Sequence, residues 1–300
     1  MGEDRAFKQI GVVGLGSMGC GIAQVVAGNG YQVRAVDVEK RLVDEAISRL
    51  DRAFQKLVQK NLMEEHERSE VLARIEGGTD LGVLKDCDLV IEAIYEDREG
   101  KRKLFSQLVQ ICTEETVFAS NTSTLSITSL VSNLDRPERF LGLHFFNPAP
   151  VMKLVEVVKT AATSQEVLAS VLDFVKSLGK APVVVRDQAG FLVNYLLTPY
   201  LFDSIRSLSS GLASVNDIDT GMRLGCGHPM GPLALADLIG LDVLLNAGNI
   251  LFDEYREARY APPPLLKRLV ALGDLGAKSG RGFYDYKGEE KSKPRDLMGL

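Results

Sequence analysis

His144 and Glu156 are the residues whose spacing points most directly to chemistry. Each stands in one of two apolar runs that flank a break containing Asn147, Pro148 and Pro150. Apolar, β-branched runs bounded by Asn and Pro are typical of strands. If the chain folds back about Pro150, the two side chains face each other with Cβ atoms about 5 Å apart. The carboxylate would then hold the imidazole in one tautomer, as in an acid/base couple. A buried histidine paired with a structural carboxylate is the alternative.

A glycine-rich turn near the start of the chain predicts dinucleotide binding. Gly14-Leu15-Gly16-Ser17-Met18-Gly19 follows an apolar run and opens a helical pattern, and Asp37 ends the next apolar run. In that context the glycines allow a tight turn, close approach of backbone to a pyrophosphate, and close packing of helix on strand. The helix N-terminus then faces the phosphates. Asp37 is expected to bind the adenosine ribose hydroxyls and to repel a 2′-phosphate, which favours NAD over NADP.

Polar residues also follow two later apolar runs that read as strands. Glu96 and Lys101 follow Leu89–Ile94, and Asn121 and Ser123 follow Val117–Ser120. Because ligands of open α/β sheets bind at the carboxyl ends of the strands, all four are candidate site residues. We expect Glu96 and Lys101 on the nicotinamide side of the cofactor, Asn121 among the cofactor-binding residues, and Ser123 on a substrate oxygen. The alternatives are ordinary helix-start residues for Glu96 and Lys101, and a helix N-cap for Ser123.

A charged segment, Glu39–Ile75, interrupts the expected alternation of strands and helices. Leu and Val recur in it at helical spacing, and Asn61–Met63 is a plausible corner, so we expect a projecting helical hairpin. Lys56 and Lys60 lie one helical turn apart there and are candidates to meet an acidic ligand tail. A solvated charged face without a ligand is the alternative.

The pattern changes near Arg186–Asp187 from alternating strands and helices to helices alone. We therefore expect an α/β domain over residues 1–186, with a Rossmann-type, mostly parallel sheet, and an all-α domain over residues 187–300. The helices predicted in the second domain cover residues 192–208, 215–223, 232–255 and 264–272. Asn194 lies in the first turns of the first of these, on an otherwise apolar face. A polar amide there needs a partner, which is either the substrate beside the His/Glu pair or neighbouring backbone.

The composition narrows the class of protein. The 300 residues are 45% hydrophobic and carry a formal net charge of −5, which is ordinary for a globular protein and gives no basic excess for nucleic acid. We expect neither a secretory signal nor a membrane span. Four scattered cysteines without a CxxC motif suggest reduced thiols in the cytoplasm, and three histidines give little support for a metal site.

Taken together, these motifs resemble those of the NAD-dependent L-3-hydroxyacyl-CoA dehydrogenases, particularly the short 3-hydroxybutyryl-CoA dehydrogenase branch. The matching pieces occur in family order and cover nearly the whole chain. They are Gly14–Gly19, Ser120–Ser123, His144–Pro148 with Leu154–Glu156, Gly190–Asn194, and Pro229–Pro232 followed by Gly282–Tyr284. The combination of the His-Phe-Phe-Asn-Pro and Leu-Val-Glu pieces is the most specific part of the resemblance.

The resemblance implies a role for each candidate. His144 would be the catalytic base and Glu156 its orienting partner, and Ser123 and Asn194 would position the reacting oxygen. Lys60 would correspond to the family's lysine near the CoA moiety. Glu96 and Lys101 would lie near nicotinamide and its ribose. The family also implies an acyl-CoA substrate and a homodimer formed through the helical domain.

Two positions depart from the family pattern. Ala53 stands where some members have a serine near CoA, and Tyr195 follows Asn194 where arginine is common. Against the family pattern, the first departure would remove a polar contact from the CoA region, and the second would remove a local charge pair.

The expected reaction is the oxidation of an L-3-hydroxyacyl-CoA to the 3-oxoacyl-CoA, and its reversal, with short acyl chains favoured. One alternative is a β-hydroxyacid or lambda-crystallin-type sugar-acid dehydrogenase acting on a free acid. The β-hydroxyacid enzymes resemble each other in a catalytic lysine on a long helix, and the corresponding helix of this chain offers Asn194 and no lysine. A second alternative is a non-catalytic NAD-binding protein, which we would expect to have lost His144 or Glu156.

Overall fold

The computed structural model describes residues 6–287 and 292–297, and it divides into two compact units, Met1–Gln188 and Ala189–Leu300. Asp187, which we expected to open the second domain, belongs to the first unit. Its carboxylate accepts hydrogen bonds from the Ser126 hydroxyl and from the backbone N–H groups of Ile127 and Thr128. These bonds hold it on the first unit.

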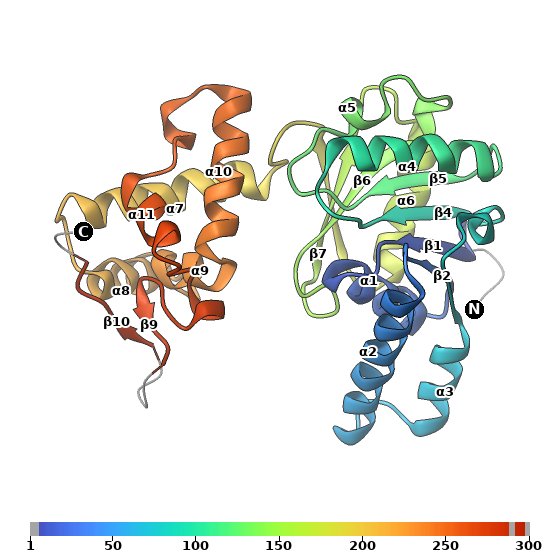
Figure 1. Cartoon of the computed structure of the whole chain (residues 1–300), viewed down its shortest axis with the longest axis horizontal. Helices are drawn as coiled ribbons and strands as arrows, with labels where there is room; N and C mark the ends of the chain where they lie inside the picture. The colour runs from blue at the N-terminus through green and yellow to red at the C-terminus, as the bar shows by residue number, and fades with distance from the viewer. Residues whose placement is uncertain (1–5, 288–291, 298–300) are drawn as a thin grey trace. The chain divides into compact units, whose positions relative to one another are not determined.

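The first unit is built on one sheet, as the sequence predicted (Figure 1). Within the described residues its strand order is β3-β2-β1-β4-β5-β6-β7-β8, and the pairs are parallel except β6 with β7, which is antiparallel. The strands are β1 Gln9–Val13, β2 Gln32–Val36, β3 Ile75–Gly78, β4 Leu89–Glu92, β5 Val117–Ser120, β6 Phe140–Phe145, β7 Leu154–Lys159 and β8 Ala181–Arg186. Edge strand β3 was not predicted, because Ile-Glu-Gly-Gly carries one apolar side chain and no alternation.

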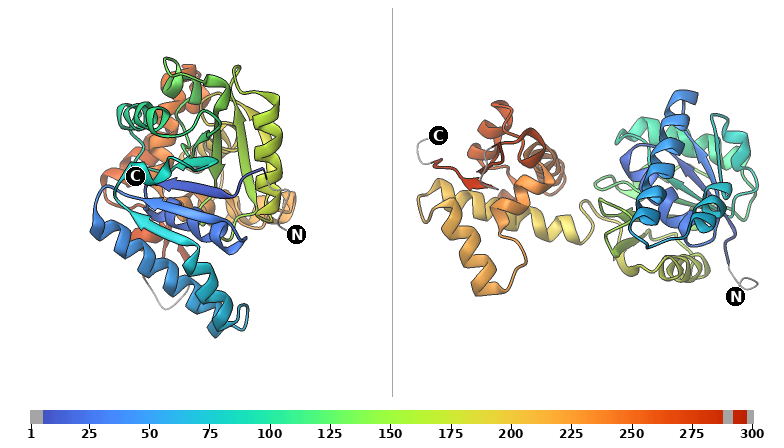
Figure 2. Two further views of the ribbon diagram at one scale, coloured as in Figure 1. Left: turned by 90° about the vertical axis from the view of Figure 1, so that its right-hand side faces the viewer. Right: turned by 90° about the horizontal axis from the view of Figure 1, so that it is seen from below.

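Helices cover both faces of this sheet (Figures 1 and 2). Alternate residues of β4 show the two sides: Leu89 and Ile91 pack in one apolar cluster with α1 and α6, and Val90 packs in the other with α4. Burial on both faces explains why β4 is a nearly continuous apolar run. The helices of this unit are α1 Ser17–Gly28, α2 Lys40–Gln59, α3 Glu65–Ala73, α4 Arg98–Ile111, α5 Ile127–Val131 and α6 Gln165–Ser177.

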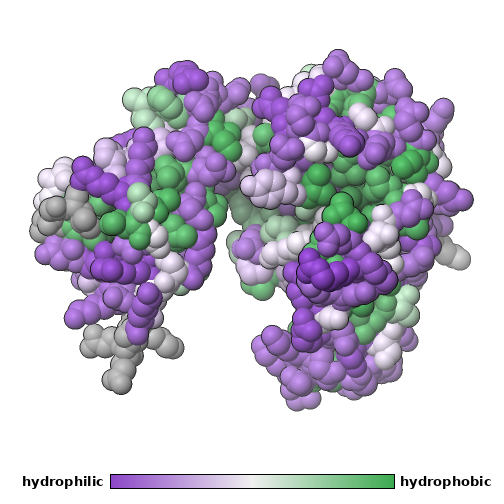
Figure 3. Space-filling view, viewed as in Figure 1, coloured by the Kyte–Doolittle hydropathy of each residue, from purple (hydrophilic) through white to green (hydrophobic). Residues whose placement is uncertain are grey.

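The expected hairpin is formed by α2 and α3. Four side chains at helical spacing on α2, Val43, Ala46, Leu50 and Phe54, are buried and belong to the cluster that also contains α1. The surface of the hairpin visible in Figure 3 is mostly hydrophilic. The apolar stripe therefore anchors the hairpin to the sheet and leaves its charged face exposed.

The second unit is mostly helical. Its helices are α7 Val193–Ser209, α8 Val215–Cys226, α9 Pro232–Ile239, α10 Leu241–Tyr255 and α11 Pro264–Ala271. The 3-10 turn η3 Ala258–Tyr260 lies between α10 and α11, and the 3-10 turn η4 Ala277–Ser279 and the short strands β9 Tyr284–Asp285 and β10 Lys293–Pro294 follow α11. The prediction of one helix over residues 232–255 was wrong. Gly240, with φ +103°, ends α9, and the two halves are bent by 94°.

In the parts of the chain that the structure describes, no single helix is long and apolar enough to cross a membrane, whereas the bent pair α9 and α10 meets that test by length and composition alone.

A buried carboxylate, Asp237 on α9, ties the C-terminal strand region to the helices. It accepts hydrogen bonds from the backbone N–H groups of Phe283 and Tyr284, both at 2.9 Å, and from the Tyr286 hydroxyl at 3.1 Å. Burial raises the pKa of Asp237 to about 6 in spite of these donors. The folded protein therefore holds this proton at pH values where the unfolded chain has released it.

Asp237 should make stability depend on pH. Because its folded pKa is raised from 3.8 to about 6, unfolding releases a proton between these values, and the free energy of unfolding falls as pH rises through them. The full contribution is about 3 kcal/mol. We expect Asp237→Asn to be less stable overall, because its amide has one acceptor oxygen where two backbone N–H groups each bond an oxygen now, and to lack this pH dependence. Urea unfolding between about pH 4 and about pH 7 measures both effects.

The matched control is Asp253→Asn, which changes an exposed aspartate of the same unit. In this variant the free energy of unfolding should change with pH as it does in the parent chain. If the free energy of unfolding of Asp237→Asn also changes with pH as in the parent chain, Asp237 does not titrate in this range.

Candidate active site

His144 and Glu156 face each other directly, as predicted. The antiparallel register of β6 and β7 pairs the two residues, and His144 Nδ1 lies 2.6 Å from Glu156 Oε2. His144 is 6% exposed and Glu156 is fully buried. With Nδ1 held by the carboxylate, Nε2 is the ring atom through which His144 would exchange a proton. The Phe146 ring packs against the imidazole, with centroids 4.6 Å apart.

Lys180 anchors the loop that joins the two strands. Its ammonium is buried and donates to the carbonyl oxygens of Ala149 and Met152, each at 2.7 Å. Burial lowers the pKa of Lys180 from its ordinary value. Sequence reasoning missed this residue, because its partners are backbone atoms that no side-chain pattern reveals.

Asn121 joins the ends of two neighbouring strands. Its side-chain oxygen accepts a hydrogen bond from the backbone N–H of Phe145 at 2.9 Å, and its backbone N–H donates to the backbone carbonyl oxygen of Glu92. It thereby fixes the residue that follows His144. A contact of Asn121 with the cofactor remains a prediction.

A buried carboxylate and lysine lie beneath the carboxyl ends of β4 and β5. Lys101 is 1% exposed, and its Nζ lies 2.5 Å from Glu92 Oε1, 3.2 Å from Glu96 Oε2 and 3.3 Å from the carbonyl of Ile94. The second oxygen of Glu92 accepts from the Ser120 hydroxyl at 2.6 Å. The three N–H donors of Lys101 thus have partners inside the protein, so Lys101 is placed to hold Glu96 rather than to face a ligand. Sequence reasoning did not single out Glu92, because one carboxylate within an apolar run does not reveal its distant partners.

Glu96 organises the polar turn after β5. Its Oε1 accepts from the hydroxyls of Thr122 and Thr124 and from the backbone N–H of Ser123 at 3.1 Å. Burial acts to raise the pKa of Glu96, but the Lys101 charge and the hydroxyl donors outweigh it and lower the pKa. Glu96 therefore stays ionised at neutral pH.

Ser123 is exposed at this turn and is not a helix cap. The N-cap of α5 is Ser126, whose hydroxyl oxygen accepts from the backbone N–H of Ser129. The alternative role considered for Ser123 is thereby removed, and its hydroxyl remains a candidate for binding a substrate oxygen.

The glycine-rich turn between β1 and α1 has the shape that a dinucleotide requires. Gly14 adopts φ +90°, and a Cβ on Gly19 would lie 1.7 Å from the Gly14 carbonyl oxygen, so neither position accepts a side chain. Gly16 and Ser17 are exposed at the start of α1, and Met18 is half-buried. Nothing lies within 4 Å of a Cβ built on Gly16, which leaves the backbone at the helix N-terminus open to a pyrophosphate.

Asp37 is half-buried at the end of β2, beside this turn. Its Oδ2 accepts from the backbone N–H of Leu15 and its Oδ1 from that of Val38, each at 2.7 Å. The carboxylate is thus fixed next to the glycine-rich turn, where it fits the ribose role that the sequence predicted.

The other candidates lie on the hairpin or in the second unit. Lys56 and Lys60 are both exposed, in the last turn of α2 and directly after it, and Ala53 one turn earlier is half-buried. Asn194 is half-buried in the first turn of α7. His228 lies with its Nδ1 at 3.1 Å from the Tyr200 hydroxyl, which agrees with a structural role.

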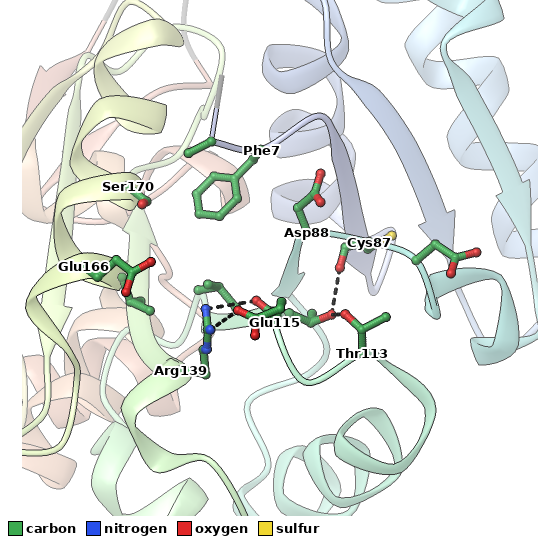
Figure 4. A pocket seen from close by; sticks show the side chains of 13 residues that line it. Phe7, Cys87, Asp88, Thr113, Glu115, Arg139, Glu166 and Ser170 are labelled. Carbon is green, nitrogen blue, oxygen red and sulfur yellow. Dashed lines mark hydrogen bonds and ion pairs between the residues drawn. The ribbon is translucent and has the colours of Figure 1, made fainter. Parts of the chain in front are cut away.

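The pocket drawn in Figure 4 is not this site. It is lined by Phe7, Asp88 and Val117, which precede or begin β1, β4 and β5, together with Glu115 and Arg139. It therefore lies at the amino ends of the strands, whereas the candidates on the sheet lie at the carboxyl ends. Among the residues that the structure describes, no group of three or more His, Cys, Asp or Glu side chains is arranged to hold a metal ion.

Comparison with known proteins decides the family. Residues 9–188 match the model of the 3-hydroxyacyl-CoA dehydrogenase NAD-binding domain, and residues 190–286 match that of the 3-hydroxyacyl-CoA dehydrogenase C-terminal domain. The chain belongs to the 3-hydroxyacyl-CoA dehydrogenase family. The resemblance seen in the sequence is thereby confirmed, and NAD is the cofactor.

Relatives in this dehydrogenase family match over nearly their full length. The chain is 43% identical to a 3-hydroxybutyryl-CoA dehydrogenase of Mycobacterium tuberculosis, over 94% of this chain and 99% of the relative. It is 44% identical to the human mitochondrial hydroxyacyl-coenzyme A dehydrogenase, over 93% of this chain and 91% of the human protein. The crystal structure of (S)-3-hydroxybutyryl-CoA dehydrogenase from Ralstonia eutropha superposes with a TM-score of 0.90 at 42% identity, covering 94% of this chain and all of that one.

Replacing Asp37 should alter cofactor choice. We expect Asp37→Ala to weaken NADH binding by roughly 10-fold, because hydrogen bonds to a charged acceptor are lost. The preference for NADH over NADPH should become smaller. Titration of both nucleotides by fluorescence gives the two dissociation constants. Asp44→Ala, an exposed aspartate on α2, is the control and should bind both as the parent does. An unchanged preference in Asp37→Ala would exclude the ribose role.

Proposed function

We propose that this dehydrogenase oxidises the L-3-hydroxyl group of short acyl-CoA thioesters to the ketone with NAD, and catalyses the reverse reduction. The observation that carries the proposal is the buried contact between His144 and Glu156 near the carboxyl end of β6. Relatives of this chain that match over their full length are 3-hydroxybutyryl-CoA dehydrogenases, which supports short-chain 3-hydroxyacyl-CoA as the substrate.

His144 acts as the base in the direction of oxidation. As the hydride leaves the substrate carbon, imidazole Nε2 accepts the hydroxyl proton, and in the reverse direction it returns that proton to the forming hydroxyl. Glu156 fixes the ring by holding Nδ1–H and stabilises the imidazolium that forms. Bound NAD supplies the hydride acceptor.

Other residues orient the reactants. Ser123 and Asn194 hold the reacting oxygen by hydrogen bonds, so that its proton points at His144. Glu96 binds on the nicotinamide ribose side, where Lys101 keeps its carboxylate in place. The exposed ammonium groups of Lys56 and Lys60 bind the phosphates of CoA.

Assembly and location complete the proposal. The second unit exposes Leu196 on α7, Leu238 on α9 and Val243 on α10, each more than half exposed, and these apolar side chains support a homodimer formed through this unit. Cys20, Cys87 and Cys112 are buried thiols, which suits a protein of the reducing cytoplasm.

The two alternative functions are disfavoured by particular residues. A dehydrogenase that acts on a free β-hydroxyacid needs a catalytic lysine on the helix that follows the α/β domain. The sequence of α7 contains no lysine. A non-catalytic NAD-binding protein has no need of a histidine and a buried carboxylate in contact, and both are kept here.

Loss of the base should abolish most turnover. We expect His144→Gln to lower kcat with acetoacetyl-CoA and NADH by roughly 10²-fold or more, because no group remains to donate the proton. NADH affinity should be unchanged, since the glycine-rich turn is untouched. His228→Gln is the matched control and should retain full activity. Near-normal turnover in His144→Gln would contradict the proposed mechanism.

Removing the hairpin lysine should weaken thioester binding. An exposed lysine paired with a phosphate contributes about 1 kcal/mol, so Lys60→Ala should raise the KM for acetoacetyl-CoA several-fold with little change in kcat. Lys103→Ala on α4, also an exposed lysine, is the control. Equal KM values in the two variants would place the CoA phosphates elsewhere, and activity with free acetoacetate alone would favour the free-acid alternative.

A further inference from the structure

A small apolar cluster surrounds the start of α7 and is separate from the main core of the second unit. Its buried members are Ala189, Leu251 and Tyr260, with Tyr195 and Tyr255 packed against them. These residues come from the segment before α7, from the first turn of α7, and from α10 and η3. The cluster therefore lies around the turn that carries Asn194.

The backbone at this point is sharply turned. Gly190 has φ +75° and Phe191 has φ +47°, so two successive residues adopt the left-handed region just before Leu192, the N-cap of α7. A Cβ on Gly190 would lie 2.7 Å from Leu251 Cδ2. A left-handed non-glycine residue is costly and persists where surrounding contacts enforce it.

Two tyrosine hydroxyls bond the backbone on either side of Asn194. Tyr255 donates to the carbonyl oxygen of Ala189 at 2.9 Å, and Tyr260 donates to that of Tyr195 at 3.3 Å. Burial raises the pKa of both tyrosines to about 12, so the two hydroxyls keep their protons at physiological pH.

Arg259 joins the two sides of the cluster. Its guanidinium carbon lies 4.8 Å from the ring centroid of Tyr195 and 4.6 Å from that of Tyr260, within cation–π distance of both. The Tyr195 ring also meets Tyr255 edge to face at 5.5 Å. A cation from η3 thus reaches the first turn of α7.

We propose that Arg259, together with Tyr195, Tyr255 and Tyr260, positions Asn194 for the reaction. The cluster fixes the first turn of α7 from both sides and so sets the direction of the Asn194 amide. This inference rests on the proposed role of Asn194 in holding the reacting oxygen. Arg259 is a positioning residue, and it acts through Asn194 without touching the substrate.

The first test compares two neighbouring arginines. Arg259→Gln removes the planar cation and should lower kcat/KM for acetoacetyl-CoA by roughly fivefold to tenfold, with NADH affinity unchanged. Arg256→Gln is the matched control, because Arg256 lies over Phe252 and pairs with Asp253, and it should leave kcat/KM unchanged. Equal kcat/KM values in the two variants would overturn the inference.

A double-mutant cycle with Asn194→Ala then separates positioning from general damage. If Arg259 acts through Asn194, Arg259→Gln should cause no further loss of kcat/KM in the Asn194→Ala background. The same loss in both backgrounds would overturn the inference and leave the role of Asn194 standing. An Asn194→Ala variant with parental activity would overturn that role and the inference with it.

If Arg259→Gln does not fold, a milder variant can take its place in the double-mutant cycle. Tyr255→Phe removes only the hydroxyl that donates to Ala189, and the same cycle applies to it. A loss of kcat/KM that disappears in the Asn194→Ala background supports the inference, and a loss that persists there contradicts it.

Discussion

The hydrogen bond between His144 Nδ1 and Glu156 Oε2 sets a constraint on the whole first unit. Glu156 is fully buried, and a carboxylate out of contact with water is costly unless a partner compensates it. The partner can lie directly opposite because β6 and β7 run antiparallel in a sheet whose other described pairs are parallel. A parallel pair would need a crossover of a dozen or more residues, and the connection between these strands, residues 146–153, has eight.

Further contacts keep this pair in register with the rest of the site. Lys180 holds the connecting loop from one side, and Asn121 holds the residue after His144 from the other. The parallel order of β1, β2, β4 and β5 brings the glycine-rich turn, Asp37 and the Glu96 turn to the same edge of the sheet. Buried Lys101 then fixes Glu96 between two strands. The first unit thus supplies both the proposed acid/base pair and the turn predicted to bind the cofactor.

Much of this could be predicted from the sequence, because the informative patterns were local. The spacing of His144 and Glu156 about Pro150 predicted their contact, and the glycine-rich turn predicted the fold around it. Features that depend on distant partners were missed: the buried environment of Lys101 and the carbonyl partners of Lys180 follow from tertiary packing. The break at Gly240 was missed because one glycine within a long apolar run does not by itself distinguish a bend from a continuous helix.

The central claim is that Glu156 fixes the His144 ring so that Nε2 exchanges the proton. Nitrogen-15 NMR of protein labelled at histidine tests it most directly, with the His144 signals assigned from the His144→Gln variant. We expect neutral His144 to carry its proton on Nδ1, with the strongly deshielded proton of a short hydrogen bond to a carboxylate, and Glu156→Gln to remove that proton signal. A neutral ring protonated on Nε2, or spectra that Glu156→Gln leaves unchanged, would contradict the account.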